Sequence, residues 1–384
     1  MENARDDEAA GVSSSEKERS NTRYCRSRRG GQLQTHRTPA SRSARSQQLD
    51  DRPSKTPEIG DVIDGKYTLL RLLGEGGMGK VYEAVHVHIG KRLAIKVLHS
   101  DLAHNDVMVE RFRQEARAAA LVEQPGVIDI TDVGVTADGV HYLVMERLDG
   151  ECLADILRRR HWLEPELAVA IACQLLVTLA AAHDRGVIHR DVKPANIFIV
   201  DSGHGEPTVK LLDFGIAKVT ESRAYESGDA VDGGLTNTGS YLGTPHYMAP
   251  EQALGFNKSD QRSDLFAVGV VLYRCLTGQL PFKGQRGVTL LHSMISDQPT
   301  APGDHRPDLA PDLCTAVLDA IQSEPDRRFQ SAVEMLAALL PFLHAESGLF
   351  VTPLPYSLTL DADPDAKLAR EVTKIESNVV ARQA

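Results

Sequence analysis

The sequence predicts a two-lobed α+β fold, in which a β-rich lobe with one key helix precedes a mainly helical lobe. Short runs typical of strands occur between residues 67 and 146, and helical periodicity dominates after Gly150. With 42% hydrophobic and 25% charged residues, the composition is that of a soluble globular protein. It excludes collagen-like, coiled-coil and wholly disordered classes. The 384 residues are enough for about two to three packing units of roughly 150 residues each.

Residues 1–57 differ in composition from the rest of the chain. They are rich in Ser, Arg, Thr and Gln, contain few aliphatic residues, and carry a net charge of +4, which leaves −14 for the remainder. Such a segment cannot bury enough apolar surface to offset the entropy of ordering, so it is predicted to be a disordered tail. A basic tail can contact nucleic acid, but Ser/Arg-rich tails are more often flexible arms, and nucleic-acid binding is not expected.

The β-rich lobe is predicted from runs of β-branched and aromatic residues. These runs indicate three antiparallel strands at 67–73, 81–87 and 92–98. A helix is predicted over 107–122, where Ala and Leu alternate with Arg and Glu, and two further strands follow at 128–135 and 140–146.

The second lobe is predicted from helical patterns at 165–185, 263–277 and 331–342, which Gly- and Pro-marked loops separate. The longest apolar stretch, 167–182, is interrupted by polar residues and is shorter than the roughly 20 residues that a membrane span needs. It is therefore predicted to be a buried helix. Residues 344–384 are predicted to form a C-terminal extension, in part disordered.

Cysteine usage and the first residues of the chain indicate the cellular compartment in which the protein is expected. The five cysteines are odd in number and far apart, which argues against a disulfide framework or a zinc site. His86 and His88 share a strand face but have no third metal ligand nearby. The chain starts with acidic and polar residues, unlike a secretory signal. We expect a cytoplasmic protein that does not contact a membrane.

A glycine-rich run, GEGGMGKV at residues 74–81, joins the first two predicted strands. Glycines allow backbone N–H groups to approach a polyphosphate, although a simple hairpin turn is an equal explanation for this run alone. Because the run joins two strands, it disfavours the Rossmann and P-loop alternatives. Lys96 lies in the third strand, and Glu115 in the following helix is its natural partner if the ammonium holds two phosphates. Either residue alone is equally explained as a surface residue.

The segment HRDVKPAN at residues 189–196 is followed by DFG at 213–215. It places a carboxylate, an ammonium and an amide within six residues, and a second carboxylate follows the strand-like run 209–212. Phosphoryl transfer needs an acceptor for the proton of the attacking hydroxyl, a cation near the transferred group, and oxygen ligands for Mg²⁺.

Together with APE at residues 249–251, these motifs occur in the order found in one family. Over about residues 67–343, the sequence resembles eukaryotic-type (Hanks-type) serine/threonine protein kinases, particularly the bacterial ones. The resemblance implies a bilobal protein-kinase-like fold, with an N-lobe at 58–147 and a C-lobe at 148–343.

The resemblance also implies roles for individual residues. Asp191 and Lys193 would be catalytic, as the acceptor of the hydroxyl proton and the cation at the γ-phosphoryl group. Asn196 and Asp213 would bind Mg²⁺, or Mn²⁺ as a substitute. Met145 would be the gatekeeper beside the hinge. The nucleotide-binding residues would be Leu73, Gly74, Gly76, Gly77, Gly79, Val81, Ala94, Lys96, Glu115, Glu146, Leu148 and Phe198.

Further positions that match the family are structural or regulatory. Asp264 would hold the backbone of the catalytic loop, Glu251 would pair with Arg328, and Thr244 would bridge the catalytic Asp and Lys. Thr236 and Thr238 match activating autophosphorylation sites in related bacterial kinases. A phosphate on that loop would pair with the arginine of the HRD motif.

The expected function is transfer of the γ-phosphoryl group of Mg-ATP to Ser/Thr hydroxyls of proteins, by a non-specific serine/threonine protein kinase. Its substrates would include a second copy of itself, met in trans as a transient homodimer. A catalytically silent pseudokinase scaffold is the alternative, which is disfavoured because every phosphate, metal and base position holds a competent residue. A small-molecule phosphotransferase is disfavoured by the APE segment.

Overall fold

A computed structural model describes residues 56–201, 207–215, 245–255, 259–284 and 287–343 of the chain. Outside the described residues lie the tail up to residue 55, the C-terminal extension, and the three threonines named above, Thr236, Thr238 and Thr244.

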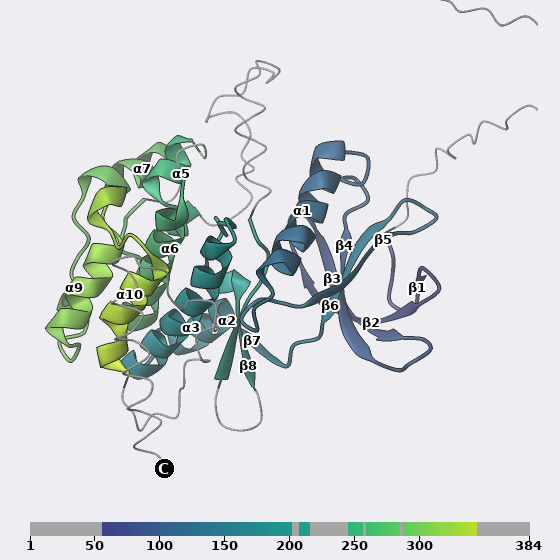
Figure 1. The fold of residues 1–384 in the computed structure, drawn as a ribbon, viewed down its shortest axis with the longest axis horizontal. Coiled ribbons are helices and arrows are strands. Elements are labelled where there is room, and N and C mark those ends of the chain that lie inside the picture. Colours follow the sequence, from purple (N-terminus) through teal and green to yellow (C-terminus); the bar gives the residue numbers. More distant parts are fainter. Residues whose placement is uncertain (1–55, 202–206, 216–244, 256–258, 285–286, 344–384) are drawn as a thin grey trace, which may run out of the picture. The chain divides into compact units, whose positions relative to one another are not determined.

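The first half of the described chain forms an antiparallel sheet of six strands in the order β1-β2-β3-β4-β6-β5 (Figure 1). Its strands are β1 (Val62–Ile63), β2 (Tyr67–Glu75), β3 (Gly79–His86), β4 (Arg92–Leu98), β5 (Ile130–Val135) and β6 (His141–Glu146). In the register, Val81 lies opposite Lys96, and Ala94 lies opposite both Glu83 and Met145. Directly opposed residues share a face of an antiparallel sheet, so these five side chains all belong to one face.

Helix α1 (Asp106–Val122) covers that same face. It starts at Asn105, whose side-chain oxygen accepts hydrogen bonds from the backbone N–H groups of Val107 and Met108. Its apolar positions Val109, Phe112 and Ala116 recur at helical spacing and pack against residues of β4 and β6. This packing fixes the rotation of the helix and turns Glu115 toward the sheet.

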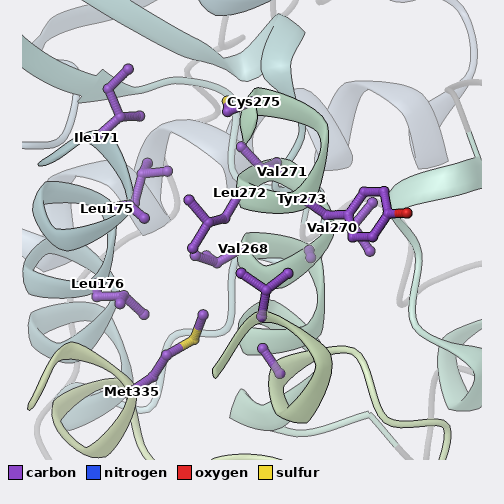
Figure 2. Packing of buried hydrophobic residues seen from close by; sticks show 14 of the residues in the cluster. Ile171, Leu175, Leu176, Val268, Val270, Val271, Leu272, Tyr273, Cys275 and Met335 are labelled. Carbon is purple, nitrogen blue, oxygen red and sulfur yellow. The ribbon is translucent and has the colours of Figure 1, made fainter. Parts of the chain in front are cut away.

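The second half is mainly helical. Its two longest helices are α3 (Pro165–Asp184) and α6 (Gln261–Thr277), and both are almost wholly buried. Figure 2 shows how their side chains interlock: Leu175 and Leu176 of α3 face Leu272 of α6, and Met335 approaches from α10 (Ala332–Leu339). The other helices are α2 (Leu153–Arg160), α5 (Pro250–Leu254), α7 (Gly287–Ser296), α8 (Pro302–His305) and α9 (Pro311–Ala320), with the 3₁₀ turns η1 (Pro194–Asn196), η2 (Pro245–Tyr247), η4 (Pro325–Arg327) and η5 (Leu340–Phe342).

By length and composition, α3 could cross a membrane, but 83% of its most apolar window is buried inside the fold. Its apolar character is therefore accounted for by the core, as the interrupted run in the sequence indicates.

A small antiparallel sheet, β7-β8-β9, belongs to the second half of the chain, and site residues flank its strands. It consists of β7 (Gly150–Cys152), β8 (Ile197–Asp201) and β9 (Pro207–Leu211). Because Ile197 pairs with Leu211, the residues that precede β8 and follow β9 meet at the same end of this hairpin. Asn196 and Asp213 are those residues.

The predicted strands and helices are confirmed within a few residues of their observed ends, apart from the predicted 331–342 helix. That segment divides into α10 and η5, because a proline, Pro341, follows Leu340 and ends the regular helix. Helices α2, α5, α7, α8 and α9 and strands β1, β7 and β8 were not predicted.

Candidate active site

Three charged side chains from distant segments meet on the α1-covered face of the large sheet. The Nζ atom of Lys96 lies 3.0 Å from Glu115 Oε2 and 2.8 Å from Asp213 Oδ1. Lys96 and Glu115 are buried, whereas the Asp213 side chain is half exposed. The structure therefore forms the Lys–Glu pair expected from the sequence and adds the carboxylate of the DFG segment to it.

Burial and charge act in opposite directions on this pair. Burial alone would lower the pKa of Lys96, but the carboxylates of Asp213 and Glu115 raise that pKa overall, so the ammonium remains charged. Burial raises the pKa of Glu115 to about 6, against the opposing effect of the Lys96 charge. The Glu115 carboxyl is therefore half ionised near pH 6, and the pair becomes fully ionised only at higher pH.

The catalytic loop brings Asp191, Lys193 and Asn196 into mutual contact. Lys193 Nζ donates to Asp191 Oδ2 at 2.6 Å, and Asn196 Nδ2 donates to the same oxygen at 3.0 Å and to the Asp191 carbonyl at 2.9 Å. These two donors hold the carboxylate in one orientation. With its amide nitrogen engaged, Asn196 has its side-chain oxygen available as a metal ligand.

A buried carboxylate, Asp264 of α6, supports the backbone of this loop. It accepts from the backbone N–H groups of His189 at 2.9 Å and Arg190 at 2.7 Å, and its Oδ2 lies 2.8 Å from His183 Nε2. Burial alone would raise the pKa of Asp264, but the hydrogen bonds from the His183 ring and from the loop backbone hold that pKa below its usual value. Arg190 has a φ of 64°, so the loop is held in a left-handed conformation that this carboxylate stabilises.

The imidazole of His189 connects the loop to the DFG segment. Burial lowers the pKa of His189, and the neutral ring donates from Nε2 to the Leu212 carbonyl at 3.0 Å. Its Nδ1 accepts from the Asp191 backbone N–H at 3.2 Å, and its ring lies 4.7 Å from that of the buried Phe214. The Gly215 N–H donates to the His189 carbonyl at 2.8 Å. Asp191 and Asp213 are thus held by one connected set of backbone contacts.

The donor set at this end of the hairpin fits a divalent cation that binds phosphates. Among the described residues, no group of three or more His, Cys, Asp and Glu side chains could hold a metal ion by itself. Mg²⁺ typically takes one or two protein oxygens and completes its shell with phosphates and water. Asp213, whose side chain is half exposed, and Asn196 supply such a pair. Asn196 is tied to the DFG segment because its backbone carbonyl accepts a 2.8 Å hydrogen bond from the Leu212 N–H.

The predicted base-pocket residues Val81, Ala94 and Leu148 belong to one apolar cluster with Met145. Val81 and Leu148 pack, half-buried, against the buried Ala94 and Met145. Phe198 lies in β8, paired with Cys152 of β7, and is half-buried. Leu73, at the end of β2, is largely exposed.

The glycine-rich run forms the turn between β2 and β3. Gly76 N donates to the Gly79 carbonyl at 2.9 Å, and a Cβ on Gly79 would collide with the Val97 carbonyl oxygen, so this position requires glycine. Around Gly74, by contrast, a Cβ would meet no atom within 4 Å. The His99 ring, which no motif indicated, also reaches the turn, with Nε2 2.9 Å from the Gly76 carbonyl.

The structural pair expected beyond the catalytic loop, Glu251 with Arg328, has the predicted contacts. Arg328, which is 4% exposed, contacts both carboxylate oxygens of Glu251 at 2.8 and 2.9 Å, and Ser263 donates to the same carboxylate at 2.6 Å. This bidentate pair anchors the APE segment to the helical core.

With this geometry established, comparison with known proteins defines the class. The sequence matches the protein kinase domain family over residues 67–338, and the chain belongs to that family. The predicted protein-kinase-like fold is confirmed.

Individual relatives are bacterial. The chain is 43% identical over 280 residues to the serine/threonine-protein kinase pkn2 of Myxococcus xanthus, covering 72% of this chain and 32% of that protein. It is 37% identical over 329 residues to pkn3 of the same organism, covering 82% and 59%. Among solved structures, the PknI kinase domain of Mycobacterium tuberculosis is similar with a TM-score of 0.56 and 28% identity, covering 74% of this chain and 99% of that one. The chain thus spans about a third to three fifths of the length of these two Myxococcus relatives.

Proposed function

We propose that this protein is a serine/threonine protein kinase that transfers the γ-phosphoryl group of ATP to hydroxyls of protein substrates. The observation that carries the proposal is the Lys96 ammonium, held between Glu115 and Asp213 at 3.0 and 2.8 Å. An arrangement of this kind can bind a polyphosphate and its divalent cation together. Perturbed pKa values of this kind cluster at functional sites, which favours an active enzyme over a silent scaffold.

The residues of the catalytic loop supply the remaining chemistry. Asp191 accepts the hydrogen bond of the attacking hydroxyl and takes its proton, and Lys193, 2.6 Å away, balances the charge that develops on the transferred group. Asn196 and Asp213 hold Mg²⁺, or Mn²⁺, which when bound neutralises phosphate charge. The backbone of Glu146 and Leu148 reads the adenine.

The names of the relatives support the proposed substrate class, and the cysteine usage supports the proposed compartment. Several relatives carry the name serine/threonine-protein kinase, which supports Ser and Thr hydroxyls as acceptors. An ATP-dependent enzyme with widely spaced free cysteines is suited to the cytoplasm, where we place it.

Regulation by autophosphorylation is part of the proposal. Among the described residues, the Nε atom of Arg190 is buried and has no hydrogen-bond partner, and burial lowers the pKa of this guanidinium. A phosphate delivered by Thr236 or Thr238 would supply a hydrogen-bond acceptor for this nitrogen. We therefore expect the enzyme to phosphorylate these two threonines in trans, through a transient homodimer.

Incorporation of labelled phosphate from [γ-³²P]ATP into a generic basic protein tests the main proposal, with Asp191→Asn as the matched control. Incorporation by the wild type alone supports it. If the wild type binds Mg-ATP but transfers no phosphate, the pseudokinase alternative replaces it. Peptide mass spectrometry on the same two proteins tests autophosphorylation: unmodified Thr236 and Thr238 in a fully active wild type would exclude that part.

A further inference from the structure

The hinge consists of residues 146–149, from the end of β6 to the residue before β7. Its first two residues, Glu146 and Arg147, carry opposite charges and are held from two sides. Glu146 Oε1 accepts from Lys210 Nζ of β9 at 2.6 Å and from the Asp129 backbone N–H at 2.9 Å. The Lys210 side chain is only 15% exposed. These contacts tie the first hinge residue to the strand that leads into the DFG segment.

The next residue, Arg147, is held from the opposite side by the large sheet. Its Nε lies 3.2 Å from Glu83 Oε1, an ion pair without hydrogen-bond alignment, and its Nη1 lies 2.5 Å from Asp149 Oδ1. The Arg147 side chain is mostly buried. Arg147 stands between Glu146 and Leu148, whose backbone groups are the ones proposed to read adenine.

Glu83 itself is unusual because it is a carboxylate in the middle of a strand with 1% exposure. Besides Arg147, it accepts from Arg71 Nε at 2.6 Å and Arg92 Nη1 at 2.7 Å. The hydrogen bond from Arg92 is the main cause that lowers the pKa of Glu83, and the other two arginines add to it. The carboxylate therefore stays ionised at neutral pH, covered by three guanidinium groups.

The register places this ionic cluster beside the base pocket. Glu83 lies directly opposite Ala94, which lies opposite Met145, and Val81 is two residues from Glu83 on the same strand. Side chains two residues apart share a face, so Glu83 is on the face that forms the adenine walls. It is therefore placed to connect that wall to the hinge.

We propose that Glu83 is a positioning residue for the nucleotide base: it holds Arg147, and through Arg147 it fixes the hinge peptides that recognise adenine. This inference rests on the proposed kinase function. Glu83 acts on base recognition and leaves the phosphate-binding and proton-accepting groups in place. Its loss should weaken binding of ATP and the preference for ATP over GTP, without slowing the chemical step.

The test compares Glu83→Gln, Arg147→Gln and the double variant with wild type. The control is Glu110→Gln, which removes a carboxylate from an exposed ion pair with Arg117 on α1. Binding of a fluorescent ATP analogue, its displacement by ATP and GTP, and KM and kcat are measured for each protein. We expect the Kd and KM for ATP to rise about five- to tenfold in both single variants, which corresponds to about 1.0–1.4 kcal/mol. The ATP-over-GTP ratio should fall, kcat should stay within about twofold, and the double variant should be no worse than either single one.

Several outcomes would overturn the inference. One is an unchanged KM and nucleotide preference in folded Glu83→Gln; another is an equal change in Glu110→Gln; a third is a loss confined to kcat. If Glu83→Gln does not fold, Arg147→Gln decides alone, and Arg147→Lys should restore part of the ATP preference. Failure of the proposed kinase function would be a separate result: the wild type would bind ATP but transfer no phosphate. The nucleotide-binding measurements would then still test the role of Glu83.

Discussion

Replacing Gly215 with alanine should disable the catalytic carboxylate by direct steric pressure. An added Cβ at this position would lie 2.6 Å from Asp191 Cβ and 3.0 Å from the His189 carbonyl oxygen. Carbon atoms in contact are separated by about 3.5–4.0 Å, so Asp191 and the DFG segment must move apart by about 1 Å. The neighbours are a backbone carbonyl and a side chain held by Lys193 and Asn196, and neither can yield cheaply.

A displacement of about 1 Å in a reacting group costs roughly 100-fold in rate, or about 2.7 kcal/mol. We therefore expect kcat of Gly215→Ala to fall by about two orders of magnitude. Overpacking of this kind also costs about 1–3 kcal/mol of stability. The new Cβ meets neither Lys96 nor the glycine-rich run, so nucleotide binding should fall less than kcat, and any loss would come through the shifted Asp213.

The assay is steady-state phosphorylation of a basic protein at saturating Mg-ATP, together with urea unfolding. The matched control is Gly303→Ala on α8, where the new Cβ would meet Cys314 Sγ at an ordinary 3.5 Å. That variant should keep wild-type activity. A kcat for Gly215→Ala within threefold of wild type would refute the argument from contact distances.

Three further predictions concern the charged groups. Asp191→Asn should lower kcat by about 10²–10⁴-fold with little change in Mg-ATP affinity by calorimetry, whereas Asp213→Ala should weaken that affinity; equal loss of binding in both would contradict the separate roles. Because protonation of Glu115 breaks its pair with Lys96, kcat/KM should fall as pH drops through about 6, and the residual activity of Glu115→Gln should lack this acid limb. Asp264→Asn should lower the free energy of unfolding by about 3–5 kcal/mol in urea, since it removes a buried charge that holds two backbone N–H groups; a loss below 1 kcal/mol would show that the loop needs no such support.

The parts of the fold that the sequence predicted are those with long, regular patterns. Strand 92–98 and the helices near 107–122 and 165–185 were predicted within one or two residues, because each has a buried face repeated over several turns or pleats. Helix α2 was missed because it buries only Leu153 and Leu157, and two buried positions do not establish a helical periodicity in the sequence. Glu83 was missed because an acidic residue in a strand indicates an exposed position, and the arginines that bury it are distant in sequence or on other strands.

The sequence by itself predicted which residues carry the proposed chemistry, and it determined which of them are local neighbours. Asp191, Lys193 and Asn196 lie within six residues, so the backbone of one short loop is enough to bring them together. Only the tertiary structure decided that Lys96 would meet Asp213, 117 positions away. The contact of Asp264 with the catalytic loop was expected from the family resemblance and not from any local pattern. Such contacts depend on how the apolar faces of α1 and the sheet, and of α3 and α6, pack against each other. Local spacing sets a side chain's direction on its own element, whereas the packing of buried faces sets which distant side chain it meets.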